Sequence, residues 1–119
     1  MAHKAIAKGS RTPWGAAQWV DEVLPGMTNV STAGHGGIFL DRERNSIIPR
    51  YMRNASGWYE EDCEWSIPFC VFEAELVAHG IPGCFNQKTI ADGLHKKALR
   101  QWYPQWYEKF YEKEVRHGA

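Results

Sequence analysis

The stretch Gly57-Trp58-Tyr59-Glu60-Glu61-Asp62-Cys63-Glu64-Trp65 sets four carboxylates and one thiol between aromatic residues. Ser56-Gly57 breaks the chain before it, and apolar residues at helical spacing follow it as far as Ala74. We therefore expect a helix that begins near Glu60. Because proline lacks the amide hydrogen that an inner helical turn needs, we expect Pro68 to interrupt or kink this helix.

Two interpretations of this acidic stretch compete. The favoured one is structural, because acidic residues at a helix N-terminus complement the helix dipole and accept hydrogen bonds from its free amides. The alternative is a nucleophilic Cys63 with His35 as its base, the imidazole being oriented by Glu60, Glu61 or Asp62. Neighbouring carboxylates raise the pKa of a thiol, and a free cysteine is usually a small buried side chain. These five residues therefore remain candidates, and no catalytic residue is assigned.

The segment Gly34-His35-Gly36-Gly37 is the expected neighbour of the acidic stretch. Residues 27–33 and 38–40 on either side of it are β-prone, so the sequence predicts a hairpin with these glycines in the turn. Glycine lets another backbone or a ligand approach closely. We therefore expect the turn to pack against residues 58–63, with His35 in contact with them.

A helix is predicted for residues 12–24. Thr12 can cap its free amides, and Pro13 suits the first helical position. Apolar residues from Trp14 to Leu24 follow helical spacing, and Pro25-Gly26 would end the helix.

The remainder of the chain is predicted to be mainly helical. Asp41 is a suitable cap for a short helix at 42–46. The helix from Glu60 is expected to continue through residues 72–79, and further helices are expected at 88–103 and 105–115. The predicted fold class is therefore α+β, a short antiparallel β-hairpin or small sheet packed against four to five helices. We expect residues 1–11 to form a flexible arm and residues 12–119 to form a single globular domain.

Composition restricts the function classes. The formal net charge is zero, which argues against direct nucleic-acid binding because such binding needs a cationic excess. Four arginines form the one candidate basic patch, for which a solvated surface is the favoured interpretation: Arg42, Arg44, Arg50 and Arg53. Three cysteines, without a secretory leader or a long apolar span, favour a reducing, cytosolic setting and no membrane.

No cofactor and no metal are expected from the sequence. His35 and His79, with the carboxylates at 60–62, are suitable ligand types, but no fixed motif spacing joins them. The C-terminal aromatic run, which includes Trp102 and Trp106, exceeds what one helical face can bury. Packing over the hairpin and a partner surface are equally supported interpretations of that run.

Three motifs together resemble a small domain family found in proteins of phages, plasmids and other mobile elements. They are Thr12-Pro13-Trp14-Gly15, then Ser31-Thr32 with Gly34-His35-Gly36-Gly37, and Trp58-Tyr59-Glu60-Glu61-Asp62-Cys63-Glu64-Trp65. The resemblance covers roughly residues 12–103. It implies an accessory role in a mobile element within the bacterial cytoplasm, and it brings no catalytic assignment.

The function expected from the sequence is a non-enzymatic inhibitor of a host defence system, similar to an anti-CRISPR protein, that binds a host protein or ribonucleoprotein complex. A hydrolase or transferase that uses Cys63 and His35 is the alternative, and a nucleic-acid-binding regulator is third. A homodimer is left open. The binding residues expected are His35, Trp58, Tyr59, Glu60, Glu61, Asp62, Arg42, Arg44, Arg50, Arg53, Trp102 and Trp106.

Overall fold

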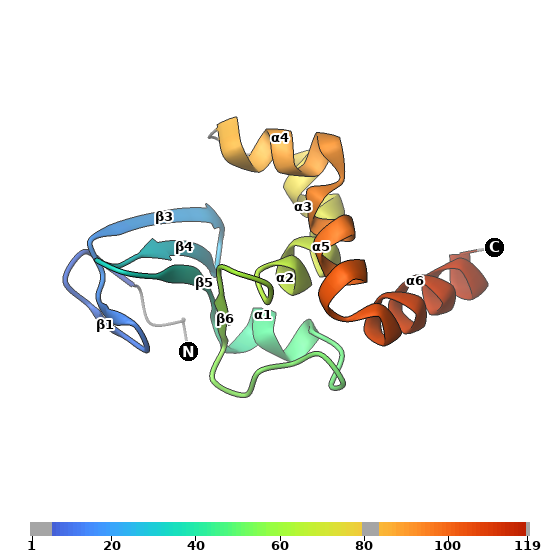
Figure 1. The fold of residues 1–119 in the computed structure, drawn as a ribbon, viewed down its shortest axis with the longest axis horizontal. Helices are drawn as coiled ribbons and strands as arrows, with labels where there is room; N and C mark the ends of the chain where they lie inside the picture. Colours follow the sequence, from blue (N-terminus) through green and yellow to red (C-terminus); the bar gives the residue numbers. More distant parts are fainter. Residues whose placement is uncertain (1–5, 80–83, 119) are drawn as a thin grey trace.

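The computed structural model describes residues 6–79 and 84–118. The first five residues of the predicted arm and the helix end expected at Gly80 lie outside these ranges. The strands are β1 (Arg11–Thr12), β2 (Gly15–Ala16), β3 (Trp19–Leu24), β4 (Met27–Ser31), β5 (Gly36–Leu40) and β6 (Trp58–Glu60). The helices are α1 (Arg42–Ile47), α2 (Ser66–Val71), α3 (Glu73–Ala78), α4 (Cys84–Asp92), α5 (Leu94–Trp102) and α6 (Pro104–Gly118), as labelled in Figure 1.

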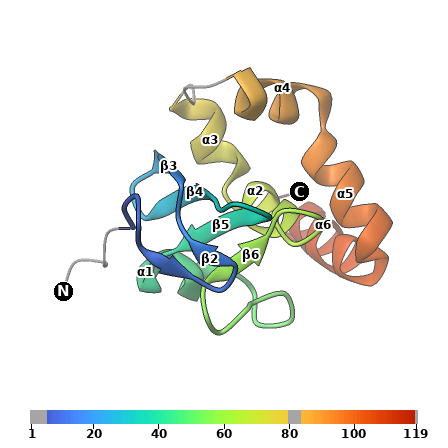
Figure 2. The same cartoon turned by 60° about the vertical axis from the view of Figure 1, so that its left-hand side comes forward.

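The predicted α+β class is confirmed. Strands β3, β4, β5 and β6 form an antiparallel sheet in that order, and β1 pairs with β2 in a separate hairpin. Figures 1 and 2 place the sheet at one end of the molecule and α3 to α6 toward the other, with α2 between them. The molecule is elongated, with principal extents of 44, 29 and 27 Å.

The helix predicted to begin at Thr12 is wrong, because this segment is the tip of the β1–β2 hairpin. The Thr12 hydroxyl accepts a hydrogen bond from the Trp14 amide at 3.1 Å and donates one to the Gly15 carbonyl at 2.7 Å. A threonine that bonds its own local backbone in this way stabilises a turn instead of a helix start. Pro13 and Trp14 therefore form the loop between the two short strands.

The rest of the predicted helix is strand β3. It pairs with β4 across Pro25-Gly26, with Leu24 opposite Met27. Gly26 has a φ of 83°, a conformation that glycine adopts without steric cost. This tight connection lets β3 and β4 close a hydrogen-bonded ladder, which outweighs the helical spacing of the apolar residues.

A hairpin is present where one was predicted, but Gly36 and Gly37 lie in β5, so the connection consists of residues 32–35. β4 and β5 pair from Met27 opposite Leu40 to Ser31 opposite Gly36. The cap predicted at Asp41 is also present, since its side chain accepts a hydrogen bond from the Arg44 amide at 2.8 Å at the start of α1.

The acidic stretch is not a helix N-terminus, so this part of the prediction is wrong. Residues 58–60 form β6 at the sheet edge, residues 61–65 form turns, and α2 begins only at Ser66. The side chain of Tyr59 is fully buried, and its hydroxyl donates a hydrogen bond to Asn45 Oδ1 at 2.6 Å. Burial of this ring, together with backbone pairing to β5, favours the extended conformation.

The helical breaks also differ from those predicted. Pro68 lies in the first turn of α2, where amides need no intrahelical partner, so it does not kink the helix. The break lies at Phe72, between α2 and α3. Gly93, with a φ of 69°, separates α4 from α5 where one helix was expected, and α4 includes the Cys84–Gln87 segment predicted as a connection.

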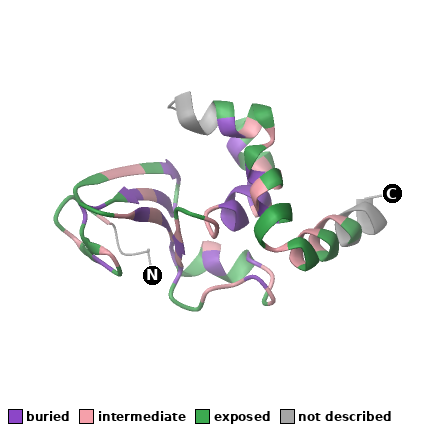
Figure 3. Cartoon of the chain, in the orientation of Figure 1, coloured by how far each residue is buried: buried purple, intermediate pink, exposed green. Residues whose placement is uncertain are grey.

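The core lies where the sheet meets α2 and α3, where buried residues gather in Figure 3. Its fully buried apolar side chains are Met27, Leu40, Ile48, Met52, Tyr59, Ile67, Phe69, Leu76 and Leu99. Leu99 faces inward as predicted, whereas Leu94 is 40% exposed and its neighbour His95 is buried instead. Within the described ranges, no helix combines the length and the apolar character needed to cross a membrane.

Candidate functional site

The glycine turn and the acidic stretch meet as the sequence predicted. Gly37 lies opposite Glu60 in the β5–β6 ladder, and the Glu61 amide donates a hydrogen bond to the Gly36 carbonyl at 2.9 Å. A Cβ atom on Gly37 would lie 2.3 Å from the Tyr59 carbonyl oxygen. Only glycine therefore permits this approach of the two strands, which brings His35 to the acidic residues.

His35 is held at both its backbone and its ring. The Thr32 hydroxyl accepts from the His35 amide at 3.2 Å and donates to the His35 carbonyl at 2.8 Å. The ring lies edge-on to Trp14, with 5.5 Å between centroids. Its Nε2 donates to Glu60 Oε2 at 3.0 Å, and its Nδ1 lies 3.5 Å from Glu61 Oε1. The imidazole is thus placed between two carboxylates.

Glu60 joins His35 to Cys63. While one carboxylate oxygen faces the imidazole, the other accepts from the Cys63 amide at 3.0 Å and from the Cys63 thiol at 3.2 Å. The thiol donates its only hydrogen to Glu60, so in the 3.3 Å contact between the sulfur and the Tyr103 hydroxyl the hydroxyl is the donor. His35, Glu60, Cys63 and Tyr103 therefore form one hydrogen-bonded chain that runs from the sheet to the connection between α5 and α6.

The protonation states follow from this chain of contacts. Burial raises the pKa of the Cys63 thiol, and its hydrogen bond to Glu60 together with the charges of Glu60 and Glu64 raises it further, despite the opposing effect of Tyr103. Burial also raises the pKa of Glu60, but the hydrogen bonds from Cys63 and His35 outweigh burial, so the pKa of Glu60 is lowered overall. At neutral pH the site therefore holds an ionised carboxylate beside a protonated thiol.

This geometry does not favour a cysteine nucleophile. Such a nucleophile needs the imidazole at the thiol, but here a carboxylate lies between Cys63 and His35. No hydrogen bond joins Cys63 to His35 within residues 6–79. The site also lacks the raised thiolate fraction that makes a cysteine reactive.

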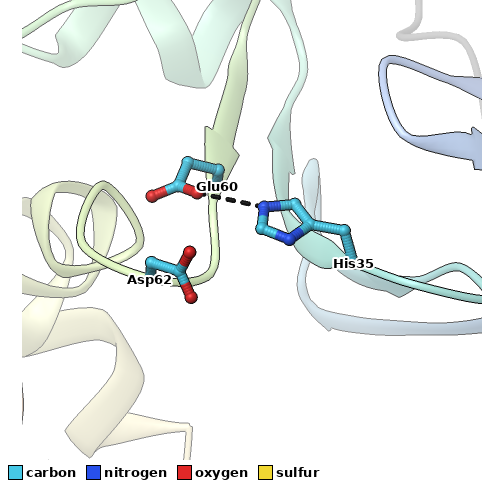
Figure 4. Close-up of side chains that lie close together, drawn as sticks. All are labelled: His35, Glu60 and Asp62. Atoms are coloured by element: carbon cyan, nitrogen blue, oxygen red, sulfur yellow. Dashed lines mark hydrogen bonds and ion pairs between the residues drawn. The ribbon is translucent and has the colours of Figure 1, made fainter.

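Three ligand-type side chains gather at this place in the structure. His35 comes from the β4–β5 turn, Glu60 from the end of β6 and Asp62 from the turn that follows, and Figure 4 shows them side by side. One ligand atom from each lies within 4.8 Å of the others. His79, also considered from the sequence, is not in this group.

The other predicted binding residues divide into buried and accessible ones. Tyr59 belongs to the core, so its assignment to a binding surface is corrected. Arg44 forms a paired contact to Glu75 at 2.8 and 3.0 Å, and Arg53 donates to the Ile48 carbonyl at 2.9 Å. These two arginines tether the fold, whereas Arg42 and Arg50 are exposed. The four arginines do not act together as one free basic patch.

The predicted C-terminal aromatic residues have mixed roles. Trp106 is partly buried and stacks on Tyr103 with 4.5 Å between ring centroids. Trp102, in contrast, is 54% exposed. Most of the described run packs against the core, which leaves Trp102 as its accessible member.

Two site residues were not predicted from the sequence. Trp14 was assigned to a helix, although its Thr-Pro-Trp-Gly setting is also typical of a turn. Tyr103 contacts Cys63 although the two residues are forty positions apart in the sequence, and no local sequence pattern predicts that contact.

The sheet, the helical half and the His35 turn together define a small α+β domain. The chain belongs to the family described as "Domain of unknown function (DUF7007)", which matches residues 7–119. No curated protein and no solved structure matches the chain. Family membership therefore brings no activity with it, and the function is argued from the surface and the site.

Proposed function

We propose that the chain is an accessory protein of a phage or other mobile element that binds a host defence complex in the bacterial cytoplasm and inhibits it by occupying its surface. The observation that supports this proposal is an aromatic–acidic surface, defined as Trp14, Phe39, Trp58, Glu61 and Asp62. The mobile-element origin rests on the resemblance of the sequence motifs described above.

The aromatic part of this surface is continuous. The rings of Trp14 and Trp58 are 5.4 Å apart, edge to face, and Phe39 lies 4.7 Å from Trp58. All three side chains are partly exposed, Phe39 and Trp58 on the sheet and Trp14 in the loop of the β1–β2 hairpin. Tryptophan and phenylalanine provide large contact area at small entropic cost, which is why they are enriched in the centres of protein interfaces.

The acidic part adjoins the aromatic part through His35, whose ring contacts both Trp14 and Glu61. Glu61 and Asp62 are exposed, and the side chain of Glu61 is 53% accessible. An apolar centre with carboxylates at its rim fits a partner that offers an apolar pocket beside basic groups. A nucleic-acid-handling defence complex has such basic surfaces, because it must bind phosphates.

The proposal is non-enzymatic because the residues considered for chemistry are engaged in structure. The Cys63 thiol is kept protonated and is held by Glu60 and Tyr103. Nucleic-acid binding is not favoured either, since Arg44 and Arg53 are bonded within the fold. Binding through an exposed surface uses none of these groups.

A phage plating assay tests the proposal. The full chain is expressed in bacterial strains that carry a defined RNA-guided or restriction defence, and plaque formation by a targeted phage is counted. We expect the chain to raise plaque formation at least tenfold in a strain whose defence it binds, and Trp58→Ala to remove that effect. Trp19→Ala is the matched control, because Trp19 is 53% exposed but lies on β3 at the opposite edge of the sheet.

A charge-reversed pair covers the case in which Trp58→Ala fails to fold. Asp62→Lys should abolish the protection, whereas Asp92→Lys, at an exposed position on α4, should leave it intact. Equal activity of all four variants would refute the assigned surface. An unchanged plaque count across RNA-guided and restriction defences would refute inhibition of host defence.

A further inference from the structure

We propose that His35, Glu60 and Asp62 form a binding site for one divalent transition-metal ion of the zinc type. The inference goes beyond the proposed partner surface, because metal binding needs no partner, although Asp62 belongs to both the surface and the ligand group. It stands on the convergence of His35, from the β4–β5 turn, with Glu60 at the end of β6 and Asp62 in the turn after it, and on the contacts that hold His35 and Glu60 (Figure 4).

The ligand atoms are close to the separation that a metal requires. Zinc–nitrogen and zinc–oxygen bonds of about 2.0–2.2 Å in a tetrahedron place neighbouring ligand atoms about 3.3 Å apart. His35 Nε2 and Glu60 Oε2 are 3.0 Å apart, so a small outward movement of either side chain would fit the ion. One oxygen of Asp62 lies within 4.8 Å of a ligand atom of His35 and of a ligand atom of Glu60, and because Asp62 is exposed its side chain can rotate inward.

His35 is already oriented as a metal-binding histidine would be. Its Nε2 faces Glu60 Oε2 at 3.0 Å, and its other nitrogen, Nδ1, lies 3.5 Å from Glu61 Oε1. Metal-bound histidines usually donate the second ring N–H to a carboxylate, which fixes the tautomer and strengthens the ligand. The edge contact with Trp14 restricts rotation of the same ring.

Glu60 is oriented from its far side. Its Oε1 accepts hydrogen bonds from the amide and the thiol of Cys63, which leaves Oε2 directed at His35. Cys63 therefore acts as a positioning residue, since its sulfur contacts the ligand and is outside the ligand group itself. Support of this kind reduces the entropy that a flexible glutamate would lose on binding the ion.

The ligand chemistry selects the class of metal. One imidazole nitrogen with two carboxylate oxygens suits zinc and similar divalent ions, whereas magnesium and calcium prefer oxygen ligands alone. Three protein ligands leave a fourth tetrahedral position for water. His35 and Glu60 side chains are 30% and 25% exposed, so water can reach that position.

The test is calorimetric titration of the full chain with zinc chloride, after removal of metals with EDTA and in the presence of a non-chelating reductant. We expect binding at one site per chain. His35→Asn and Asp62→Asn should each weaken the binding at least tenfold. Asp92→Asn, a matched change at an exposed acid on α4, should leave it within threefold of wild type.

The spectrum of the cobalt complex adds an independent readout. Cobalt bound by nitrogen and oxygen ligands gives visible d–d bands without the near-ultraviolet band of a cobalt–thiolate bond. Absence of zinc binding, wild-type affinity in Asp62→Asn, or a thiolate band that disappears in Cys63→Ser would each overturn the site.

Asp62 is exposed, so Asp62→Asn should keep the fold even if His35→Asn does not. Loss of metal binding in His35→Asn with retained phage protection would leave the proposed function intact, because His35 is outside the defined partner surface.

Discussion

The replacement of Gly37 by alanine tests the structural feature on which the site depends, which is the close pairing of β5 with β6. In the structure an added Cβ would lie 2.3 Å from the Tyr59 carbonyl oxygen, 2.4 Å from Trp14 Cη2 and 3.0 Å from Glu60 Cα. The first distance is more than 1 Å shorter than an ordinary contact of about 3.5 Å. The Trp14 ring can rotate away, but the backbone of β6 can relieve the overlap only by moving.

The expected loss of unfolding free energy follows from the movement of β6 away from β5. A backbone clash that separates two paired strands costs about 3 kcal/mol of unfolding free energy, at the upper end of the usual cost of overpacking. Gly34→Ala is the matched control, because nothing lies within 4 Å of its added Cβ and its φ is not positive. We expect Gly34→Ala to change stability by less than about 1 kcal/mol.

Urea unfolding followed by tryptophan fluorescence measures the difference. With a denaturant slope of about 1.5 kcal/mol per M, Gly37→Ala should lower the midpoint by about 2 M relative to Gly34→Ala. Because His35 reaches Glu60 through this strand pair, Gly37→Ala should also weaken zinc binding. Equal midpoints for the two variants would refute the close approach of β5 to β6.

Three further predictions concern the neighbours of this strand pair. Tyr59→Phe should lower the unfolding free energy by about 1–3 kcal/mol in urea titrations, because it removes the hydroxyl that donates to Asn45 at 2.6 Å and accepts from the Asn54 amide at 3.0 Å; no change would mean that these groups find other partners. Alkylation of Cys63 by iodoacetamide, followed by peptide mass spectrometry, should be slower than that of a free thiol, and Glu60→Gln should accelerate it, because burial and then Glu60 raise the thiol pKa. The lowered pKa of Glu60 means that its contribution to stability is complete above its unfolded pKa and is lost as the pH falls through its folded pKa. Wild-type protein should therefore lose more stability than Glu60→Gln between about pH 5 and pH 3, and parallel losses would contradict that assignment.

Local signals predicted the parts of the fold that depend on local chemistry. Asp41 caps α1 because its side chain reaches a free amide three residues away, and the glycine turn forms a hairpin because β-prone residues flank it. The meeting of that turn with residues 58–63 could also be predicted, since only glycine permits so close an approach.

The errors arose where local spacing and tertiary pairing disagree. The apolar residues from Trp14 to Leu24 match a helical period, but Pro25-Gly26 makes a tight connection that lets β3 pair with β4. Residues 58–60 resemble the acidic start of a helix, yet the buried Tyr59 and the free edge of β5 make them a strand. Pairing partners distant in sequence decided both cases, and periodicity contains no information about them.

The site could likewise be predicted only in part. His35 and Glu60 were both among the candidates from the sequence, but the sequence did not predict their roles. His35 and Glu60 are twenty-five positions apart, so no ligand motif could be recognised. The β5–β6 register places Glu60 between His35 and Cys63. Cys63, considered as a nucleophile from the sequence, therefore donates a hydrogen bond that orients the Glu60 carboxylate.

The central claim is that the glycine turn brings the His35 ring to Glu60 and Trp14, and proton–proton Overhauser contacts in solution NMR test it most directly. We predict contacts from the His35 ring protons to the side chain of Glu60 and to the indole of Trp14, whose ring centroid lies 5.5 Å away. Resolved and assigned His35 signals that contact neither residue would contradict the arrangement on which both the partner surface and the metal site rest.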